Sequence, residues 1–116
     1  MTLPELPLHE QHCRPLGPTH ALDHAAAESA LARLDAGWRI AGTESALALE
    51  REFRLSDFAA ALALANAIGA LAEAEDHHPD LELGWGRLRV RWTTHSAGGL
   101  TLNDFICAAK IDRLPP

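Results

Sequence analysis

Residues 81–105, LELGWGRLRVRWTTHSAGGLTLNDF, contain the pattern that decides the fold. Apolar side chains alternate along residues 81–85 and again along residues 88–94, with glycines at the bend between them, which predicts a β-hairpin. Residues 101–104 then have the Thr-x-x-Asp form of a capping box, which marks the start of a helix. The stretch therefore predicts two antiparallel strands followed by a helix that runs to about residue 113.

The other elements precede this stretch. Apolar residues at helical spacing, many of them alanine, predict a helix over about residues 57–75. Residues 47–55 alternate between apolar and polar side chains and predict a strand, and residues 38–41 predict a shorter strand before it. Thr19 is expected to cap a first helix over about residues 20–36.

The order of these elements is α-β-β-α-β-β-α, which predicts the α+β class. Strands joined as hairpins form an antiparallel sheet, here of four strands, and we expect the helices to pack on one of its faces. The other face is left open, so it is either solvated or joined to a second copy of the chain. We expect a single domain over residues 19–116. Four prolines predict a flexible arm over residues 1–18.

The composition limits the classes of function and location. The chain has 116 residues and a formal charge of −6, from 10 Lys and Arg against 16 Asp and Glu, which argues against a nucleic acid as its direct partner. No apolar run approaches the roughly 20 residues that span a bilayer, and the first residues lack the features of a secretory signal. Two cysteines are too few for a disulfide framework. We therefore expect a cytoplasmic protein that does not act at a membrane.

Three of the seven histidines lie where a fold presents side chains to a cleft. His77 and His78 follow the predicted helix of residues 57–75, and His95 ends the last predicted strand. If the helix continued, Glu73 would share a face with His77, four residues later, and could orient it. Imidazoles both give and take protons near neutral pH, so this group suits general acid–base catalysis.

Two other interpretations of the three histidines are open. Three histidines and a water form a known catalytic zinc site, although the adjacent His77 and His78 point in different directions on most backbones. Alternatively, the two form a structural helix end to which His95 is unrelated. The remaining histidines, in the arm or at the start of the first helix, are interpreted as polar residues without a metal: His9, His12, His20 and His24.

Several motifs agree in order and spacing with one known family. Glu73 is followed after three residues by His77-His78-Pro79, and then by Trp85, His95 and Asp104. Residues 93–105, TTHSAGGLTLNDF, look like a Thr-His-x-x-x-Gly-Leu-Thr-x-x-Asp block. These motifs resemble the signature of the pterin-4a-carbinolamine dehydratases, and the resemblance runs from about Leu22 to Leu114.

The resemblance implies the same order of elements, a four-stranded antiparallel sheet, and assembly into homodimers or homotetramers. The implied reaction is the dehydration of 4a-hydroxytetrahydrobiopterin, a pterin-4a-carbinolamine, to quinonoid dihydropterin and water. This is a hydro-lyase reaction for which the family requires neither a metal nor an organic cofactor. It would recycle the pterin of an aromatic amino acid hydroxylase, which would then be a functional partner.

The resemblance also implies roles for the histidines. His77 and His95 would be the acid–base pair on either side of the pterin, and His78 would mainly bind the substrate. Glu73 would hold His77 in place.

Two further residues of the signature have more than one explanation. Asp104 is interpreted as a helix cap and an orienting residue, because capping alone explains an acid at this position. Trp85 would either stack on the pterin as a substrate-binding residue or fill the sheet. The alternative for the whole chain is a non-catalytic binding, assembly or coactivator protein on the same fold. We would expect such a protein to lose the histidines.

Overall fold

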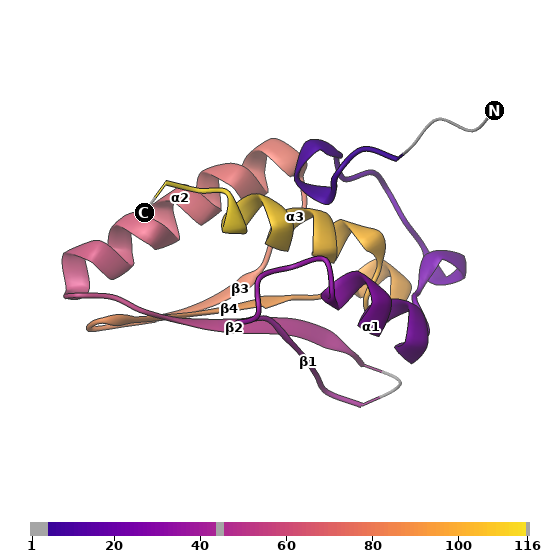
Figure 1. Cartoon of the computed structure of the whole chain (residues 1–116), viewed down its shortest axis with the longest axis horizontal. Coiled ribbons are helices and arrows are strands. Elements are labelled where there is room, and N and C mark those ends of the chain that lie inside the picture. Colours follow the sequence, from indigo (N-terminus) through magenta and orange to yellow (C-terminus); the bar gives the residue numbers. More distant parts are fainter. Residues whose placement is uncertain (1–4, 44–45, 116) are drawn as a thin grey trace.

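A computed structural model of the chain, which describes residues 5–43 and 46–115, confirms the α+β class and the antiparallel sheet. The strands follow one another across the sheet in the order β1-β2-β4-β3. Their bounds are β1 (Arg39–Ala41), β2 (Ala48–Arg54), β3 (Asp80–Gly84) and β4 (Arg87–Trp92). The helices α1 (His24–Leu31), α2 (Phe58–Glu75) and α3 (Leu102–Asp112) all lie on one face of the sheet (Figure 1). Short 3₁₀ helices occur at η1 (Leu8–Glu10), η2 (Pro18–His20) and η3 (His95–Ala97).

The core lies between these helices and the covered face of the sheet. In the pairing of β2 with β4, Leu49 is opposite Trp92 and Phe53 is opposite Leu88, so alternate residues of the two central strands face the helices. Leu49, Leu88 and Trp92 are fully buried there, as is Phe105 of α3. The alternation of the strand sequences therefore predicts the core face correctly.

The first helix is shorter than the sequence predicts. It covers His24–Leu31 rather than about residues 20–36, and Asp23 caps it in place of Thr19 by accepting a hydrogen bond from the backbone N–H three residues later. The reason is local: Thr19 is already part of the 3₁₀ turn η2, and the chain is extended again before Asp23.

The open face of the sheet carries charged side chains. Glu50 of β2 forms ion pairs with Arg39 of β1, at 3.0 Å, and with Arg91 of β4. Arg89 of β4 pairs with Glu82 of β3 at 3.1 Å. The exposed Arg89–Glu82 pair contributes little to stability. Glu50, by contrast, is buried beside its two arginines.

Helix α2 spans one side of the sheet and ends beside the candidate site. It has 18 residues and a mean hydropathy of 1.3, which by length and composition would be enough to cross a membrane. Its buried residues Ala61, Ile68 and Ala72 belong to or adjoin the core of the domain, whereas Phe58 and Leu62 are 44% and 41% exposed. Only 17% of the helix is buried, so α2 packs on the domain along a narrow stripe and leaves an apolar outer side.

The N-terminal segment, expected to be a flexible arm, lies along α3 in the part that the structure describes (Figure 1). Leu8 and Leu16 are buried, and the side chain of Lys110 on α3 donates a hydrogen bond to the carbonyl of His9 at 3.0 Å. The prolines keep the segment from forming an α-helix, but they do not prevent its apolar residues from docking on the domain. We refer to residues 5–18 below as the arm.

Candidate functional site

His77 reaches the site because α2 ends abruptly before it. Asp76 has φ 50° and ψ 41°, a left-handed conformation that breaks the helix, and the His77 N–H bonds back to the Ala72 carbonyl at 3.2 Å. An L-residue other than glycine rarely adopts this conformation, and aspartate is one of those that tolerate it. The turn sends the chain from the helix towards β3 and leaves His77 between α2, β4 and α3.

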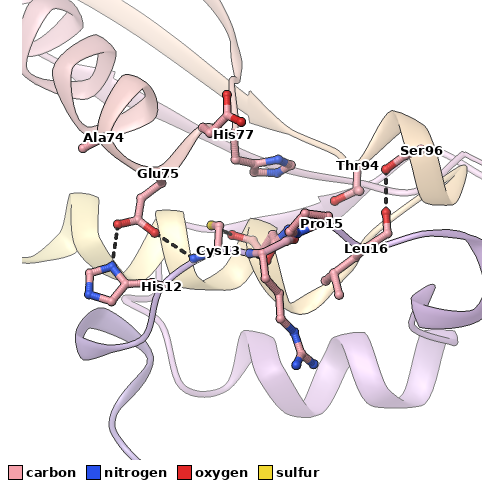
Figure 2. A pocket seen from close by; sticks show the side chains of 12 residues that line it. His12, Cys13, Pro15, Leu16, Ala74, Glu75, His77, Thr94 and Ser96 are labelled. Carbon is pink, nitrogen blue, oxygen red and sulfur yellow. Dashed lines mark hydrogen bonds and ion pairs between the residues drawn. The ribbon is translucent and has the colours of Figure 1, made fainter.

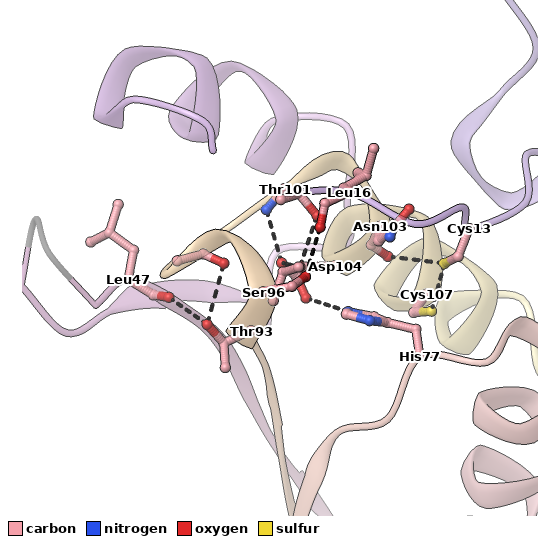
Figure 3. A network of polar contacts seen from close by, with 12 residues as sticks. Cys13, Leu16, Leu47, His77, Thr93, Ser96, Thr101, Asn103, Asp104 and Cys107 are labelled. Carbon is pink, nitrogen blue, oxygen red and sulfur yellow. Dashed lines mark hydrogen bonds and ion pairs between the residues drawn. The ribbon is translucent and has the colours of Figure 1, made fainter. Parts of the chain in front are cut away.

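The His77 ring is held on two sides. Its Nε2 lies 2.7 Å from Oδ1 of Asp104 (Figure 3). Its ring stacks on Trp92 with centroids 5.5 Å apart and planes 12° from parallel. The side chain of His77 is 12% exposed, and that of Asp104 is completely buried. The imidazole thus has one defined orientation, with only a small part of it open to solvent.

Asp104 both caps a helix and holds a histidine. Its Oδ2 accepts hydrogen bonds from the Thr101 N–H at 2.9 Å and from the Thr94 hydroxyl at 2.8 Å, and the Thr94 and Thr101 hydroxyls bond each other at 2.8 Å. The predicted capping role is therefore confirmed. A carboxylate that accepts from these donors on one oxygen is placed to accept from His77 Nε2–H on the other, which leaves the lone pair of the neutral ring on Nδ1.

Glu73 pairs with a different histidine from the one expected. Its carboxylate bonds His78 Nε2 on the surface, while His77 bonds Asp104. The expectation that Glu73 holds His77 is wrong, because it assumed a continuous helix. The left-handed Asp76 breaks the four-residue spacing, and the next two residues then point in different directions. His78 is 55% exposed at its side chain, so its bond to Glu73 is a surface contact.

His95 and Trp85 occupy different ends of the β3–β4 hairpin. His95 is exposed at the start of η3, between Thr94 and Ser96, which both line the pocket described below. Trp85 lies at the turn of the hairpin, at the other end of β3 from His77, and is 73% exposed. Trp85 therefore does not fill the sheet, and the fold of one chain does not bring it to His77.

A pocket of about 550 Å³ opens beside His77 (Figure 2). This volume is in the range that holds small organic ligands. The arm forms one wall and the end of α2 another. The lining residues are 12–16, 74–77, Thr94, Ser96 and Asn103.

Glu75 fastens the arm to the end of α2, a contact that the sequence analysis missed. Its carboxylate accepts hydrogen bonds from the Cys13 N–H at 2.7 Å and from the His12 ring at 2.8 Å (Figure 2). Burial by itself raises the pKa of Glu75. The hydrogen bond from Cys13 outweighs it, together with His12 and the nearby Lys110, so the pKa lies below its ordinary value of 4.5.

Acid should weaken this attachment. A carboxyl whose pKa is lowered by folding stabilises the fold above its ordinary pKa, and this stabilisation is lost as the pH falls through the lower pKa of the folded state. We expect Glu75→Gln to lower the free energy of unfolding by about 1 kcal/mol at pH 7. The deficit should shrink towards zero as the pH is lowered from 6 to 3, as measured by thermal unfolding. The exposed Glu28→Gln is the matched control; an equal, pH-independent deficit in both variants would contradict the assignment.

Two other arm contacts involve α3. The Arg14 N–H and carbonyl bond the side-chain amide of Asn103 at 3.2 and 2.7 Å, and the sulfur of Cys13 lies 3.4 Å from that of Cys107. The only sequence signal for the latter contact is that the chain has two cysteines. Over residues 5–43 and 46–115, no group of three or more His, Cys, Asp or Glu side chains is placed to hold a metal ion.

The arrangement can move a proton. A carboxylate at one nitrogen of an imidazole fixes its orientation and tautomer and stabilises the cation that forms when the other nitrogen accepts a proton. The pocket beside this imidazole can take a small molecule. These two features are the requirements for general base catalysis on a bound substrate.

Comparisons with known proteins agree on one family. The model of the family described as pterin 4 alpha carbinolamine dehydratase matches residues 20–114. A protein of Xanthomonas oryzae pv. oryzae (strain PXO99A), named "Putative pterin-4-alpha-carbinolamine dehydratase", is 46% identical over 112 residues, which cover 94% of this chain and 91% of the relative. One of the same name from Xanthomonas campestris pv. campestris (strain 8004) is 44% identical over the same shares.

A solved structure has the same fold. It is the crystal structure of a "transcriptional coactivator/pterin dehydratase" from Brucella melitensis, with a TM-score of 0.71 and 32% sequence identity. The match covers 78% of this chain and 94% of that chain.

Proposed function

The chain belongs to the pterin 4 alpha carbinolamine dehydratase family, and on this premise we propose that it removes water from a 4a-hydroxytetrahydropterin by histidine acid–base catalysis. The substrate would be 4a-hydroxytetrahydrobiopterin or a pterin with another side chain. The products are quinonoid dihydropterin and water, so the enzyme is a lyase. The reaction breaks the bond from C4a to the hydroxyl oxygen and removes the proton from N5.

The observation that carries this proposal is the fixed imidazole of His77 at the pocket. Its Nε2 is held by the buried Asp104 at 2.7 Å, and its ring is stacked on Trp92. A proton acceptor that is oriented in this way needs little reorganisation when it accepts a proton. We therefore assign His77 as the base that takes the N5 proton on Nδ1, with Asp104 as its orienting residue.

The other two histidines have supporting roles in this proposal. His95 would protonate the departing hydroxyl. It is not itself a lining residue of the pocket, but its neighbours Thr94 and Ser96 are, and it is open to solvent, from which it can regain a proton. His78 would bind the substrate, and its bond to the surface residue Glu73 would limit the movement of its ring. No metal or organic cofactor takes part in these steps.

A coupled assay tests the activity. A pterin-dependent aromatic amino acid hydroxylase generates the carbinolamine, and its decay is followed by absorbance with and without this protein. We expect the decay rate above the protein-free background to rise in proportion to the protein concentration. A decay rate that does not change at protein concentrations equal to the substrate would refute the dehydratase assignment.

Substitution of Trp85 tests where the pterin binds. If the substrate occupies the pocket beside His77, Trp85→Ala should change kcat and KM by less than about twofold, since Trp85 lies at the far end of β3. Steady-state kinetics in the coupled assay measure both constants. A rise of tenfold or more in KM would show instead that Trp85 reaches the substrate.

We also propose that the chain acts as a homodimer or homotetramer in the cytoplasm, coupled in function to an aromatic amino acid hydroxylase. The sheet has a free edge at β3, where Leu81 and Leu83 are 36% and 37% exposed, and α2 exposes Phe58 and Leu62. Open edges and exposed apolar groups favour association. Light scattering should give two or four times the chain mass of 12.5 kDa; a monomer at micromolar concentration would contradict this.

A binding function is the alternative, because the Brucella melitensis protein of the same fold is described as a transcriptional coactivator as well as a pterin dehydratase. The buried pairing of His77 with Asp104 favours catalysis, since a surface used only for binding has no need of an oriented imidazole beside a pocket. Recovery of a stoichiometric client protein in a pull-down, together with no dehydration in the coupled assay, would reverse this preference.

A further inference from the structure

The two cysteines of the chain, Cys13 and Cys107, meet although 94 positions separate them. Their sulfur atoms are 3.4 Å apart, within hydrogen-bond distance, and are not joined by a disulfide (Figure 3). Cys13 is half-buried in the arm and lines the pocket, and Cys107 is fully buried on α3. A disulfide has an S–S length of about 2.05 Å, so a shift of roughly 1.4 Å would join them.

Hydrogen bonds of the arm hold Cys13 in place beside Cys107 from two sides. On one side, the Cys13 N–H donates to Glu75 at the end of α2 at 2.7 Å. On the other side, the next residue of the arm, Arg14, is bonded twice to the side chain of Asn103. Asn103 lies four residues before Cys107 on α3, on the same side of the helix. The backbone around Cys13 is thus fixed opposite the Cys107 side chain.

We propose that Cys13 and Cys107 are a reversible oxidation site, in which a hydroperoxide converts the two thiols into a disulfide that fixes the arm to the domain. In the first step, the Cys13 sulfur attacks the peroxide oxygen and becomes a sulfenic acid, and the peroxide is reduced to water or an alcohol. In the second step, the Cys107 sulfur attacks the Cys13 sulfur, the S–S bond forms, and the sulfenic oxygen leaves as water with the Cys107 proton. Two thiols are oxidised and one peroxide is reduced.

The order of the two steps follows from accessibility. Cys13 lines the pocket and can meet a small peroxide, whereas Cys107 is enclosed by the core. The hydrogen bond with Cys13, together with burial, raises the pKa of Cys107, so Cys107 keeps its proton before the reaction. Cys107 is therefore not the thiol that meets the peroxide first; it reacts second, and it loses its proton to the departing sulfenic oxygen as its sulfur attacks Cys13.

The disulfide would make the arm a permanent wall of the pocket. In the reduced protein the wall is held by hydrogen bonds and packing, and it can separate from the domain whenever these open. In the oxidised protein the bond closes a loop that contains most of the chain, which restricts the unfolded state strongly. The site would thus convert a local docking contact into a covalent one, independently of any turnover of a pterin.

The test uses the whole reduced protein and hydrogen peroxide. We expect one equivalent of peroxide to remove both titratable thiols, to lower the mass by two hydrogen atoms, and to give a Cys13–Cys107 peptide in a non-reducing digest. The midpoint of thermal unfolding should rise by roughly 10 °C and return to its initial value with dithiothreitol.

The variants are Cys13→Ser, in which the buried core is untouched, and Cys107→Ala. Neither should gain stability on oxidation, and Cys13→Ser should keep its Cys107 thiol under the same treatment. The proposal fails if oxidised wild-type protein retains both thiols, carries a sulfinic or sulfonic acid on Cys13 without the disulfide, or forms only disulfides between chains. None of these readouts depends on dehydratase activity.

Discussion

His77→Ala is expected to lower kcat for dehydration by about 10²–10⁴-fold, the usual contribution of a positioned acid or base. The variant removes the nitrogen that would accept the N5 proton and leaves the pocket otherwise lined as before. Since the side chain is held at the edge of the core, some stability will also be lost, so the folded state must be checked by circular dichroism. Initial rates in the coupled assay measure the effect.

The control for this variant is His24→Ala. His24 is an exposed histidine of α1 with only a loose contact to Glu28 at 3.8 Å, so its removal should leave kcat unchanged. A His77→Ala, His95→Ala double variant that dehydrates the substrate at the wild-type rate would remove both histidines from the proposed mechanism. A loss in the double variant that is confined to KM would assign them to binding instead.

Asp104→Ala is expected to lower the free energy of unfolding by about 3–5 kcal/mol, because several buried donors are left unsatisfied at about 1–3 kcal/mol each. Three donors lose their acceptor at once: His77 Nε2–H, the Thr94 hydroxyl and the Thr101 N–H. The start of α3 also loses its cap. Denaturant unfolding measures the change, and we expect dehydratase activity to fall with it, because His77 is no longer oriented.

Asp104→Asn separates the structural role from the orienting role. Its amide oxygen can still accept from Thr94 and Thr101, so most of the stability should return. Its NH₂ group would face His77 Nε2, which would then have to accept a hydrogen bond and carry its proton on Nδ1. We expect a folded protein whose kcat is at least about tenfold below that of the wild type.

The control for Asp104 is a helix-capping aspartate that does not contact a histidine. Asp57 caps α2 through the Ala60 N–H, at 2.8 Å on the surface, so Asp57→Ala should cost about 1 kcal/mol and leave kcat unchanged. Wild-type kcat in Asp104→Asn would contradict the claim that the tautomer of His77 matters.

The sequence predicts the features of this fold that depend on neighbouring residues. Alternation along β2 and β4 identifies the core face, and the Thr101–Asp104 spacing identifies the start of α3, because both patterns are local. The first helix is predicted too long because two of the apolar positions that predict it, Leu22 and Leu34, lie beyond the two ends of His24–Leu31.

The parts of the site that the sequence does not predict depend on distant residues or on one unusual backbone conformation. Nothing in the spacing of Glu73 and His77 indicates that Asp76 is left-handed, and this angle alone reverses the expected pairing. The docking of the arm joins Cys13 to Cys107 and Glu75, which are 94 and 62 positions away. Contacts between residues that are so far apart along the chain leave no periodic pattern in the sequence.

The left-handed Asp76 makes two chemically identical side chains unequal. It sends His77 inward to a buried carboxylate and leaves His78 outside with an exposed one. Deleting a single residue before His77 would move His78 into the inward position and His77 out of it, and inserting one would move His77 to the outward position, while every histidine was retained. The length of this connection therefore matters as much to the proposed catalysis as the histidines themselves, and a comparison of residue types alone would not detect its loss.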